Sequence, residues 1–462
     1  MAVVLKFGGT SVGTFEAVSR TMEIIAARIS ECPVVCVSAL SKVTDLLYAI
    51  ADSASAGDRT KTDEQMYELR LRHLSLVCSL LSADPENCGK ASARVNEICD
   101  TLAAVVGSVT ALGDIPDRIK AVIISHGEIL SSTIICYALN SKGIRTGFAD
   151  ARRMIVTDSE HMCAEPQFDI INHKVPEVVE ETFERGTPFA SDGKSSDGGR
   201  NGAVITQGFI AANRQGAGTV LGRGGSDWSA SIIASALGAS RVEIWTDVDG
   251  IRTTDPRVCP ETCRIPRISY GEAAAMAKFG AKVLHPKTIA PAVEKRIPVL
   301  VLNSYAPDAE GTAVVPEAGP AGARGIAFKR NVYLFRYSPA AEDAFMDSLS
   351  ECRIEPDIVA SASRQMLSTV DFSHNVGEFI RLVAGKTDIL LKTGYSQLTI
   401  IGSGLLDLAP QIEEAVPMLR KNFGKMLCES NLSYILASSR LEDSVRAVHK
   451  ALFGGNGFRG TR

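Results

Sequence analysis

The sequence predicts an α/β protein in which a unit with a largely parallel sheet is followed by two small, interlocked ferredoxin-like units. Short apolar runs alternate with helical patterns as far as residue 305, which is the order of parallel strands joined by helices. A stretch rich in Pro, Gly and Ala, residues 307–323, then interrupts the pattern and indicates a linker. Beyond it a β-α-β-β-α-β order appears and begins again.

The large N-terminal unit begins with Val3–Phe7, an apolar run that ends in two glycines and indicates a buried strand entering a tight turn. Thr10 and Ser11 offer caps for a helix over residues 17–29. Helical patterns also cover residues 60–110 and the segments that end at Leu139 and Leu237. Residues 121–124 fit either a strand or a buried helix start, and residues 151–185 indicate a connecting or lid region. Further strands are predicted at residues 34–38, 144–149, 188–191, 204–210, 242–246 and 298–302.

The second of the two C-terminal units lacks its sixth element, because residues 454–462 are typical of a frayed tail. Residues 325–328, just before the first of these units, could supply the missing strand, so the two units are predicted to interlock. The predicted boundaries are 1–306 for the large unit, 307–324 for the linker, and 325–395 and 396–462 for the small units, with 325–330 completing the second.

Composition narrows the functional class. Hydrophobic residues are 45% and charged residues 22%, which is ordinary for a packed soluble protein. The net charge of −4 excludes a broad polyanion-binding surface, so no nucleic-acid partner is expected. The 11 cysteines have no CxxC spacing and indicate free thiols in a reducing compartment. No apolar run approaches ~18 residues, and the N-terminal apolar stretch is too short for a signal peptide, so we expect a cytoplasmic protein without a membrane partner.

Two glycine-rich loops are candidates for phosphate binding. Lys6-Phe7-Gly8-Gly9-Thr10-Ser11 follows the first strand, and Gly222-Arg223-Gly224-Gly225-Ser226-Asp227 precedes a helix in the same way. Glycines let backbone N–H groups approach an anion, and a helix N-terminus adds a favourable field. Each loop alone is also an ordinary strand-end turn. Two such loops after parallel strands predict a polyphosphate held between them at the carboxyl edge of the sheet.

Three further segments are less specific. Trp245-Thr246-Asp247-Val248-Asp249-Gly250 and Thr253-Thr254-Asp255-Pro256-Arg257 fit turns with Asx caps as well as ligand loops. No third ligand completes a calcium loop around the two aspartates. In the segment 279–286, Lys282 fits a solvated helix lysine as well as a phosphate contact, and His285 before Pro286 fits a structural role.

These segments, in this order and together with Ser125-His126-Gly127-Glu128, resemble the aspartate kinases, and the repeated terminal units resemble their two ACT domains. The resemblance spans almost the whole chain. It implies the amino-acid kinase fold, a three-layer sandwich, and MgATP-dependent phosphorylation of the side-chain carboxylate of L-aspartate to 4-phospho-L-aspartate. That reaction is the first step toward lysine, diaminopimelate, threonine and methionine. The resemblance also implies an amino-acid effector, lysine foremost, and a homodimer or dimer of dimers formed through the ACT domains.

The same resemblance implies residue roles. Asp227 matches the catalytic-site aspartate, Glu128 the glutamate that receives the substrate ammonium group, and Arg223 the arginine that clamps a substrate carboxylate. The other substrate-binding matches are Thr44, Gly224, Gly225 and Ser226. The matches to ATP-binding residues are Lys6, Gly8, Gly9, Thr246, Asp247, Arg252, Arg257 and Lys282.

The implied reaction needs charge and positioning more than it needs a base. A carboxylate with a pKa near ~4 is already ionised at pH 7, so no proton has to be removed from the nucleophile. Positive charge around the transferring phosphoryl group and in-line geometry are required. Lys6 therefore has a catalytic role, and Asp227 is expected to hold Lys6 or the metal site. No direct Mg²⁺ ligands are assigned, because the ion can arrive with ATP.

Two departures from the family pattern and two rival functions stay open. Arg252 replaces a common aromatic residue, and residues 338–343 lack the glycine of the usual effector loop, so lysine inhibition is undecided. The strand after the helix also ends in Ser361-Ala362-Ser363, and lysine-sensitive relatives tend to have Thr-Ser-Glu near these positions. The rivals are a kinase of the same fold with another acceptor and a catalytically inactive amino-acid sensor.

Overall fold

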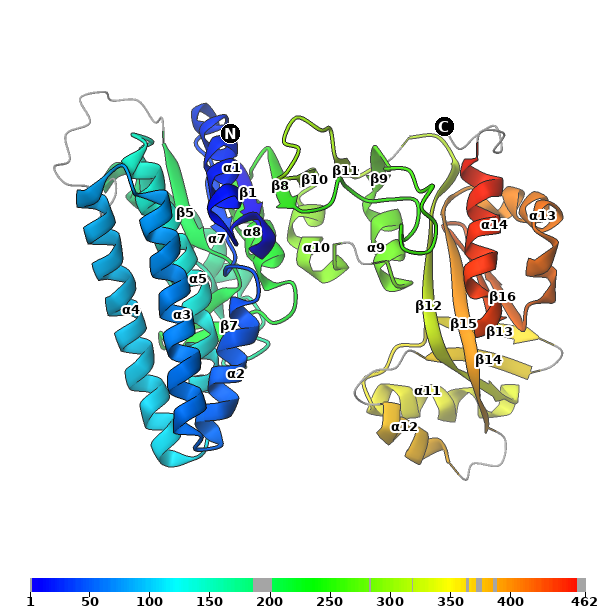
Figure 1. Ribbon diagram of the computed structural model, residues 1–462. Coiled ribbons are helices and arrows are strands. Elements are labelled where there is room, and N and C mark those ends of the chain that lie inside the picture. The colour runs from blue at the N-terminus through cyan, green and yellow to red at the C-terminus, as the bar shows by residue number, and fades with distance from the viewer. Residues whose placement is uncertain are drawn as a thin grey trace. The chain divides into compact units, whose positions relative to one another are not determined.

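The structure, a computed structural model, describes residues 2–185, 202–281, 284–317, 319–362, 365–370, 376–384 and 389–454. The chain forms two compact units (Figure 1). The first comprises Met1–Asp249 and Lys287–Val315, and the second comprises Gly250–Pro286 and Pro316–Arg462. The segment Gly250–Pro286 therefore packs in the second unit, whereas the sequence pattern predicts it within the large N-terminal unit. The predicted strand at 188–191 lies outside the described residues.

The sheet of the first unit runs in the order β3-β5-β2-β1-β8-β10-β11. Every neighbouring pair in this run is parallel except β10 and β11, which are antiparallel. The central strands are buried along most of their length, which is the reason for their continuous apolar runs. The strand bounds are β1 Val3–Phe7, β2 Val34–Val37, β3 Thr146–Ala149, β5 Ala203–Gln207, β8 Arg241–Thr246, β10 Val299–Asn303 and β11 Thr312–Val315.

Helices cover both faces of this sheet. On one face α7 (Phe168–Arg185) packs on β3 and β5, and α8 (Gly225–Leu237) packs on β1, β2 and β8. On the other face α5 (Asp117–Ser141) packs on β2, β3 and β5. Outside α5 lie the long helices at the blue and cyan edge of Figure 1, namely α2 (Val43–Ser55), α3 (Arg59–Leu80) and α4 (Pro85–Leu112). The unit also contains α1 (Phe15–Ala26), α6 (Ala151–Met154) and α10 (Pro286–Glu294).

Several predicted elements differ from the structure. Residues 121–128 lie inside α5, so the strand alternative is wrong. Residues 151–185, predicted as a connecting or lid region, contain α6, β4 (Val156–Thr157) and α7. The predicted strand 204–210 is broken after β5 by Gly208 and by Phe209, whose φ is 67°. Beyond the break β6 (Ile210–Asn213) forms a small sheet with β4 and β7 (Gly218–Val220). The predicted linker contains β11, which pairs with β10.

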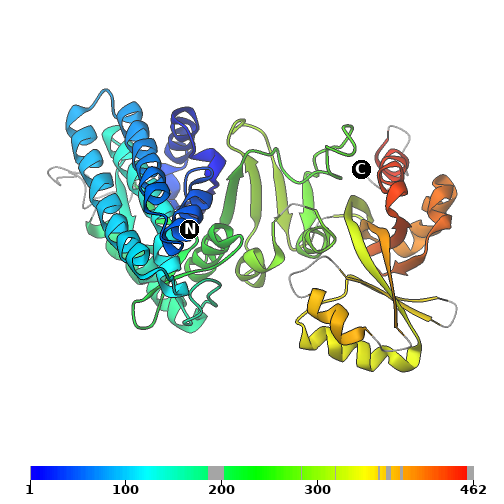
Figure 2. The same cartoon turned by 60° about the horizontal axis from the view of Figure 1, so that its bottom comes forward.

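The second unit has one antiparallel six-stranded sheet in the order β13-β14-β12-β15-β17-β16 (Figure 2). Two long strands, β12 (Gly322–Tyr337) and β15 (Ile389–Ser403), pair along almost their whole length and each serves both ferredoxin-like halves. Residues 325–328 pair with residues 398–401, so the predicted interlocking is confirmed. The other strands are β13 Ile358–Ala362, β14 Gln365–Val370, β16 Gly424–Leu427 and β17 Asn431–Ala437.

Each half of the second unit has its own core. Phe335, Phe345 and Phe379 pack edge-on or tilted at the centre of one core, between the sheet and helices α11 (Glu342–Glu351) and α12 (Val376–Val383). Leu398 and Tyr434 lie in the other, with α13 (Leu405–Ala415) and α14 (Leu441–Phe453). β9 (Arg267–Ser269) and α9 (Tyr270–Lys278) complete the elements of this unit.

Two helices, α4 and α5, are long and apolar enough to cross a membrane by length and composition. In α5 the most apolar window is 89% buried inside the protein, and in α4 it is 33% buried. A core helix passes the same test, so this finding is weak evidence for a membrane span.

Candidate functional site

An ion pair joins the two glycine-rich loops. Lys6 lies at the carboxyl end of β1, and Asp227 lies in the first turn of α8. The Lys6 Nζ atom is 2.6 Å from Asp227 Oδ1, and the two side chains are only 12% and 21% exposed. The second loop follows β7, a strand of the small sheet that is antiparallel to β6, so the prediction that it follows a parallel strand is wrong. The two loops still converge, because α8 packs across β1 and β8.

In the turn after β1, the backbone N–H groups that lack a partner among the described residues are those of Gly9 and Thr10, and not that of Gly8. The Gly8 N–H donates to the carbonyl of Trp245 at 3.1 Å and is therefore occupied. Within the described chain, the N–H groups of Gly9 and Thr10 at the start of the short 3-10 helix Gly9–Ser11 have no partner. A Cβ atom on Gly9 would lie 3.0 Å from the Ala39 carbonyl oxygen, so the close approach of these two loops favours glycine there.

A chain of hydroxyl groups fixes this turn to the ends of two other strands. Ser11 Oγ donates to Ser304 Oγ at 2.9 Å, and Ser304 Oγ donates to the Thr246 carbonyl at 3.0 Å. Thr246 is the last residue of β8, and its hydroxyl donates to Asp247 at 3.1 Å. Ser304 is not among the predicted site residues. Its only signal in the sequence is that it lies two residues after the predicted strand 298–302.

Glu128 is a buried carboxylate with one satisfied oxygen. It is 3% exposed, and its Oε1 accepts a hydrogen bond from the Ala39 N–H at 3.2 Å. Its Oε2 is buried and has no hydrogen-bond partner among the described residues. Burial raises the pKa of Glu128 to about 8, and the bond from Ala39 opposes this shift. The ammonium group of a bound ligand would donate a hydrogen bond to Oε2 and place a positive charge beside the ionised carboxylate.

Close contacts between neighbouring residues bring Glu128 near the turn that follows β1. A Cβ atom on Gly127 would lie 2.7 Å from the Ala39 Cβ, so the glycine lets α5 approach this loop closely. The Ser41 N–H donates to the Gly9 carbonyl at 3.0 Å, and Arg72 from α3 donates to the Ser41 carbonyl at 2.6 Å. Thr44, which is half-buried, lies in the first turn of α2, a few residues further along the chain.

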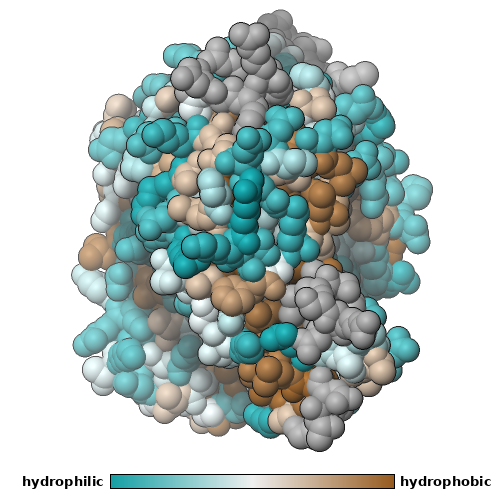
Figure 3. All heavy atoms as spheres, turned by 90° about the vertical axis from the view of Figure 1, so that its right-hand side faces the viewer, coloured by the Kyte–Doolittle hydropathy of each residue, from teal (hydrophilic) through white to brown (hydrophobic). Residues whose placement is uncertain are grey.

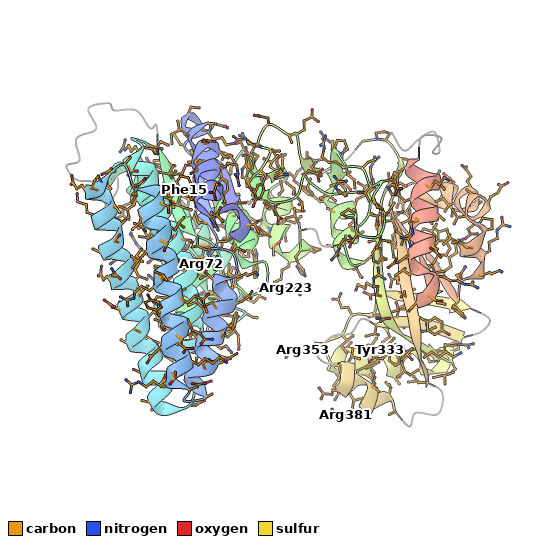
Figure 4. All side chains as sticks on the ribbon, in the orientation of Figure 1. Phe15, Arg72, Arg223, Tyr333, Arg353 and Arg381 are labelled. Carbon is orange, nitrogen blue, oxygen red and sulfur yellow. The ribbon has the colours of Figure 1, made fainter. Side chains whose placement is uncertain are left out.

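Arg223 extends from a loop whose backbone conformation favours glycine. Gly222 and Gly224 on either side of it have φ values of 74° and 73°, in the left-handed region. Gly225 begins α8, where a Cβ atom would lie 2.6 Å from the Phe209 ring, and Ser226 packs against Gly208. Arg223 is exposed and has no ion-pair partner in the described parts of the chain (Figure 4). Its guanidinium is therefore available to a carboxylate ligand.

The remaining predicted nucleotide contacts are Arg252, Arg257 and Lys282. Arg252 belongs to the second unit, where its guanidinium donates to the carbonyl and hydroxyl oxygens of Thr262 at 2.8 and 2.9 Å. Arg257, in the same unit, pairs with Asp255 at 2.6 Å on the surface. Lys282 lies outside the described residues. Among the residues that the structure does describe, no group of three His, Cys, Asp or Glu side chains is arranged to hold a metal ion.

Comparisons with known proteins identify the family that this chain resembles. Residues 1–303 match the amino acid kinase family. The chain is 30% identical to lysine-sensitive aspartokinase 3 of Escherichia coli K12 over 98% of this chain and 99% of that protein. It is 28% identical to chloroplastic aspartokinase 1 of Arabidopsis thaliana over 97% of this chain and 80% of that protein.

Solved structures give the same result. Crystalline E. coli aspartokinase III in complex with aspartate and ADP aligns with a TM-score of 0.80 at 27% identity, covering 98% of this chain and 100% of that one. The same protein in complex with lysine and aspartate aligns with a TM-score of 0.77 at 28% identity, covering 98% and 99%.

Proposed function

The chain belongs to the amino acid kinase family and, within it, to the aspartokinases, and on this premise we propose that it transfers the γ-phosphoryl group of ATP to the side-chain carboxylate of L-aspartate. The product is 4-phospho-L-aspartate, the starting intermediate for lysine, diaminopimelate, threonine and methionine. The observation that carries the proposal is the Lys6–Asp227 ion pair at 2.6 Å, which holds an ammonium group where two glycine-rich loops converge.

Glu128 and Arg223 favour an amino acid as the acceptor. The buried Oε2 of Glu128 has no partner in the described chain and suits an ammonium group. The uncommitted guanidinium of Arg223 suits a carboxylate, which it can bind with two parallel hydrogen bonds. These two groups, with Thr44 and Ser226 as further proposed contacts, distinguish L-aspartate from an acceptor that lacks an amino group.

The chain's own groups supply charge and position. The ammonium of Lys6 offsets negative charge that develops on the transferring phosphoryl group, and the free N–H groups of Gly9 and Thr10 donate to its oxygens. Asp227 keeps Lys6 in place and removes no proton, because the aspartate carboxylate is already ionised at pH 7. Mg²⁺ would enter with ATP and neutralise phosphate charge. Asp227, in contact with Lys6, offers carboxylate oxygens of the kind that Mg²⁺ prefers. Thr246 and Asp247 in the first unit, with Arg252, Arg257 and Lys282, are the proposed nucleotide contacts.

The second unit is proposed to bind an amino-acid effector, with lysine the first candidate, and to form a homodimer or dimer of dimers. Ser338, at the start of the loop without glycine, has a buried hydroxyl with no partner among the described residues. Leu390, Leu406 and Phe423 of this unit are each about half exposed, at 54%, 54% and 50%. Figure 3 shows apolar areas among hydrophilic surface, and an oligomer interface would cover such areas. None of the 11 cysteines forms a disulfide bond, which suits the proposed cytoplasmic location.

Trapping of the product tests the proposed reaction. An acyl phosphate reacts with hydroxylamine to give a hydroxamate, so incubation with MgATP, L-aspartate and hydroxylamine should yield aspartyl hydroxamate and ADP in equal amounts. Omission of L-aspartate, or its replacement by succinate, which lacks the amino group, should remove most of the product. Tight binding of L-aspartate without ADP or hydroxamate would instead support the inactive-sensor alternative.

A further inference from the structure

A cavity of about 630 Å³ lies in the first unit between α4, α5, α6 and the turn that joins β6 to β7. None of the proposed catalytic or substrate-binding residues lines it. Four arginines do: Arg94, Arg118, Arg152 and Arg153. Glu97 is the one acidic side chain among the lining residues, so the walls carry an excess of positive charge in a protein whose net charge is −4.

Most donors of these arginines are uncommitted. Each guanidinium presents five N–H donors. Arg94 uses one nitrogen on Glu97 at 2.6 Å, and its Nε is buried with no partner in the described chain. Arg153 uses one nitrogen on Glu181 at 2.6 Å. Arg118 is exposed and has neither an ion pair nor a hydrogen bond with any described residue. Arg152 is the exception, because Asp150 binds it through two nitrogens.

Two residues of the segment 125–128 also face this cavity. Ser125 and His126 line it, whereas Glu128 on the same helix contacts Ala39 in the proposed substrate site. The Nδ1 atom of His126 is bonded to the Val122 carbonyl at 2.8 Å, and burial together with Arg152 lowers the pKa of this imidazole. The histidine is therefore neutral at pH 7, and the positive charge of the cavity comes from its arginines.

We propose that this cavity is a binding site for a small oxyanion with two or more negative charges, of the polycarboxylate or phosphate-ester class. The proposal is independent of the phosphoryl transfer, because it concerns residues that the reaction does not use. Arginine forks match carboxylate and phosphate oxygens with paired hydrogen bonds, and the volume admits a metabolite-sized molecule. The apolar lining from α5 and from residues 211–212 would contact the body of such a molecule.

Calorimetric titration of the full chain tests the site directly and needs no catalytic turnover. The probes are citrate and inorganic pyrophosphate, each at constant ionic strength with chloride as the reference anion. The tighter probe assigns the polycarboxylate or the phosphate class. We expect one site per chain in this cavity, with a Kd about tenfold weaker in Arg118→Ala and in Arg94→Ala, since each substitution removes a charge-assisted contact.

Two control variants distinguish binding in this cavity from binding elsewhere on the protein. Arg59→Ala removes an arginine that is 86% exposed at the start of α3, so it changes the net charge equally and should leave the Kd unchanged. Lys6→Ala removes the lysine beside the turn after β1, where the phosphates of ATP are proposed to bind, and should leave the Kd for the cavity unchanged. Thermal unfolding of each variant shows whether it is folded. The proposal is overturned if neither probe binds in the millimolar range, if Arg59→Ala weakens binding as much as Arg118→Ala, or if only Lys6→Ala abolishes it.

Discussion

Replacement of Glu128 by glutamine tests the proposed ammonium site at its most informative residue. The carboxylate is buried, holds one hydrogen bond from Ala39, and has a pKa raised to about 8 by burial. The substrate ammonium group binds the ionised form, so the apparent affinity for L-aspartate should follow the ionised fraction of Glu128. With a pKa of about 8, that fraction is about 1% at pH 6 and about half at pH 8. The KM for L-aspartate should therefore fall about 50-fold between these two values.

The same raised pKa predicts a change in stability. In the unfolded chain Glu128 ionises near 4.5, and in the folded, ligand-free protein near 8. The folded state binds the proton more tightly, so stability is highest below pH 4.5 with respect to this group and is lost as the pH rises to about 8. The difference corresponds to at most about 5 kcal/mol. Glu128→Gln should remove this loss and raise the Tm of the ligand-free protein at pH 8.

Initial rates of ADP release at saturating MgATP, with L-aspartate varied from pH 6 to pH 8, measure the first effect. Glu128→Gln should raise the KM for L-aspartate at pH 8 by at least about 100-fold, because a charge pair inside the protein is lost. It should also remove the pH dependence of KM. Glu86→Gln, an exposed glutamate in α4, is the matched control and should behave as the native protein. A native KM that is flat from pH 6 to pH 8, or an unchanged KM in Glu128→Gln, would refute the assigned role.

Three further substitutions have distinct expected results. Asp227→Asn should lower kcat at least about 100-fold and change the KM for L-aspartate less than about threefold. Lys6 would lose the carboxylate that positions it from 2.6 Å. A near-native kcat would exclude this positioning role. Ser304→Ala should raise the KM for ATP about three- to tenfold with little change in kcat, because the hydrogen bonds of its hydroxyl to the Thr246 carbonyl and to Ser11 are both lost. An unchanged KM for ATP would contradict this. Glu243→Gln should lower the free energy of unfolding, measured by urea titration, by about 3 kcal/mol. Glu243 is 1% exposed and pairs with Arg28 at 2.6 Å and with Arg241 at 2.9 Å. A loss below about 1 kcal/mol would show that these ion pairs contribute little.

Local sequence patterns predicted those strands and helices whose own residues carry a recognisable pattern. β1 and β2 are mainly apolar runs because they are central parallel strands buried along most of their length. The interlocking of the C-terminal halves was predictable because one ferredoxin-like repeat lacked a strand and residues 325–328 could supply it.

Features that depend on contacts between distant residues were not predictable from local patterns. Residues 250–286 pack in the second unit, where Thr253 Oγ1 is 2.9 Å from His449 Nε2 on α14, and no local pattern marks that contact. β11 escaped detection because its four residues form a strand only by pairing with β10.

In the candidate site, the sequence indicated which residues take part but not how they contact one another. The glycine loops identified Lys6 and Asp227 as candidates, and the structure places them in contact. The glycine pattern did not indicate that the Gly8 N–H is taken by Trp245, or that Ser304 lies beside the turn. Both facts depend on which strands become neighbours in the sheet. The roles assigned to the site residues stay predictions, those of Arg252, Arg257 and Lys282 included.

The most direct test of the central claim is ADP release by the native chain and by Lys6→Ala with MgATP and L-aspartate. The account predicts turnover that requires L-aspartate in the native protein and a kcat at least about 1,000-fold lower in Lys6→Ala, with L-aspartate still bound in calorimetry. ADP release that does not depend on L-aspartate, or a Lys6→Ala variant with native kcat, would contradict phosphoryl transfer at the junction of the two glycine-rich loops.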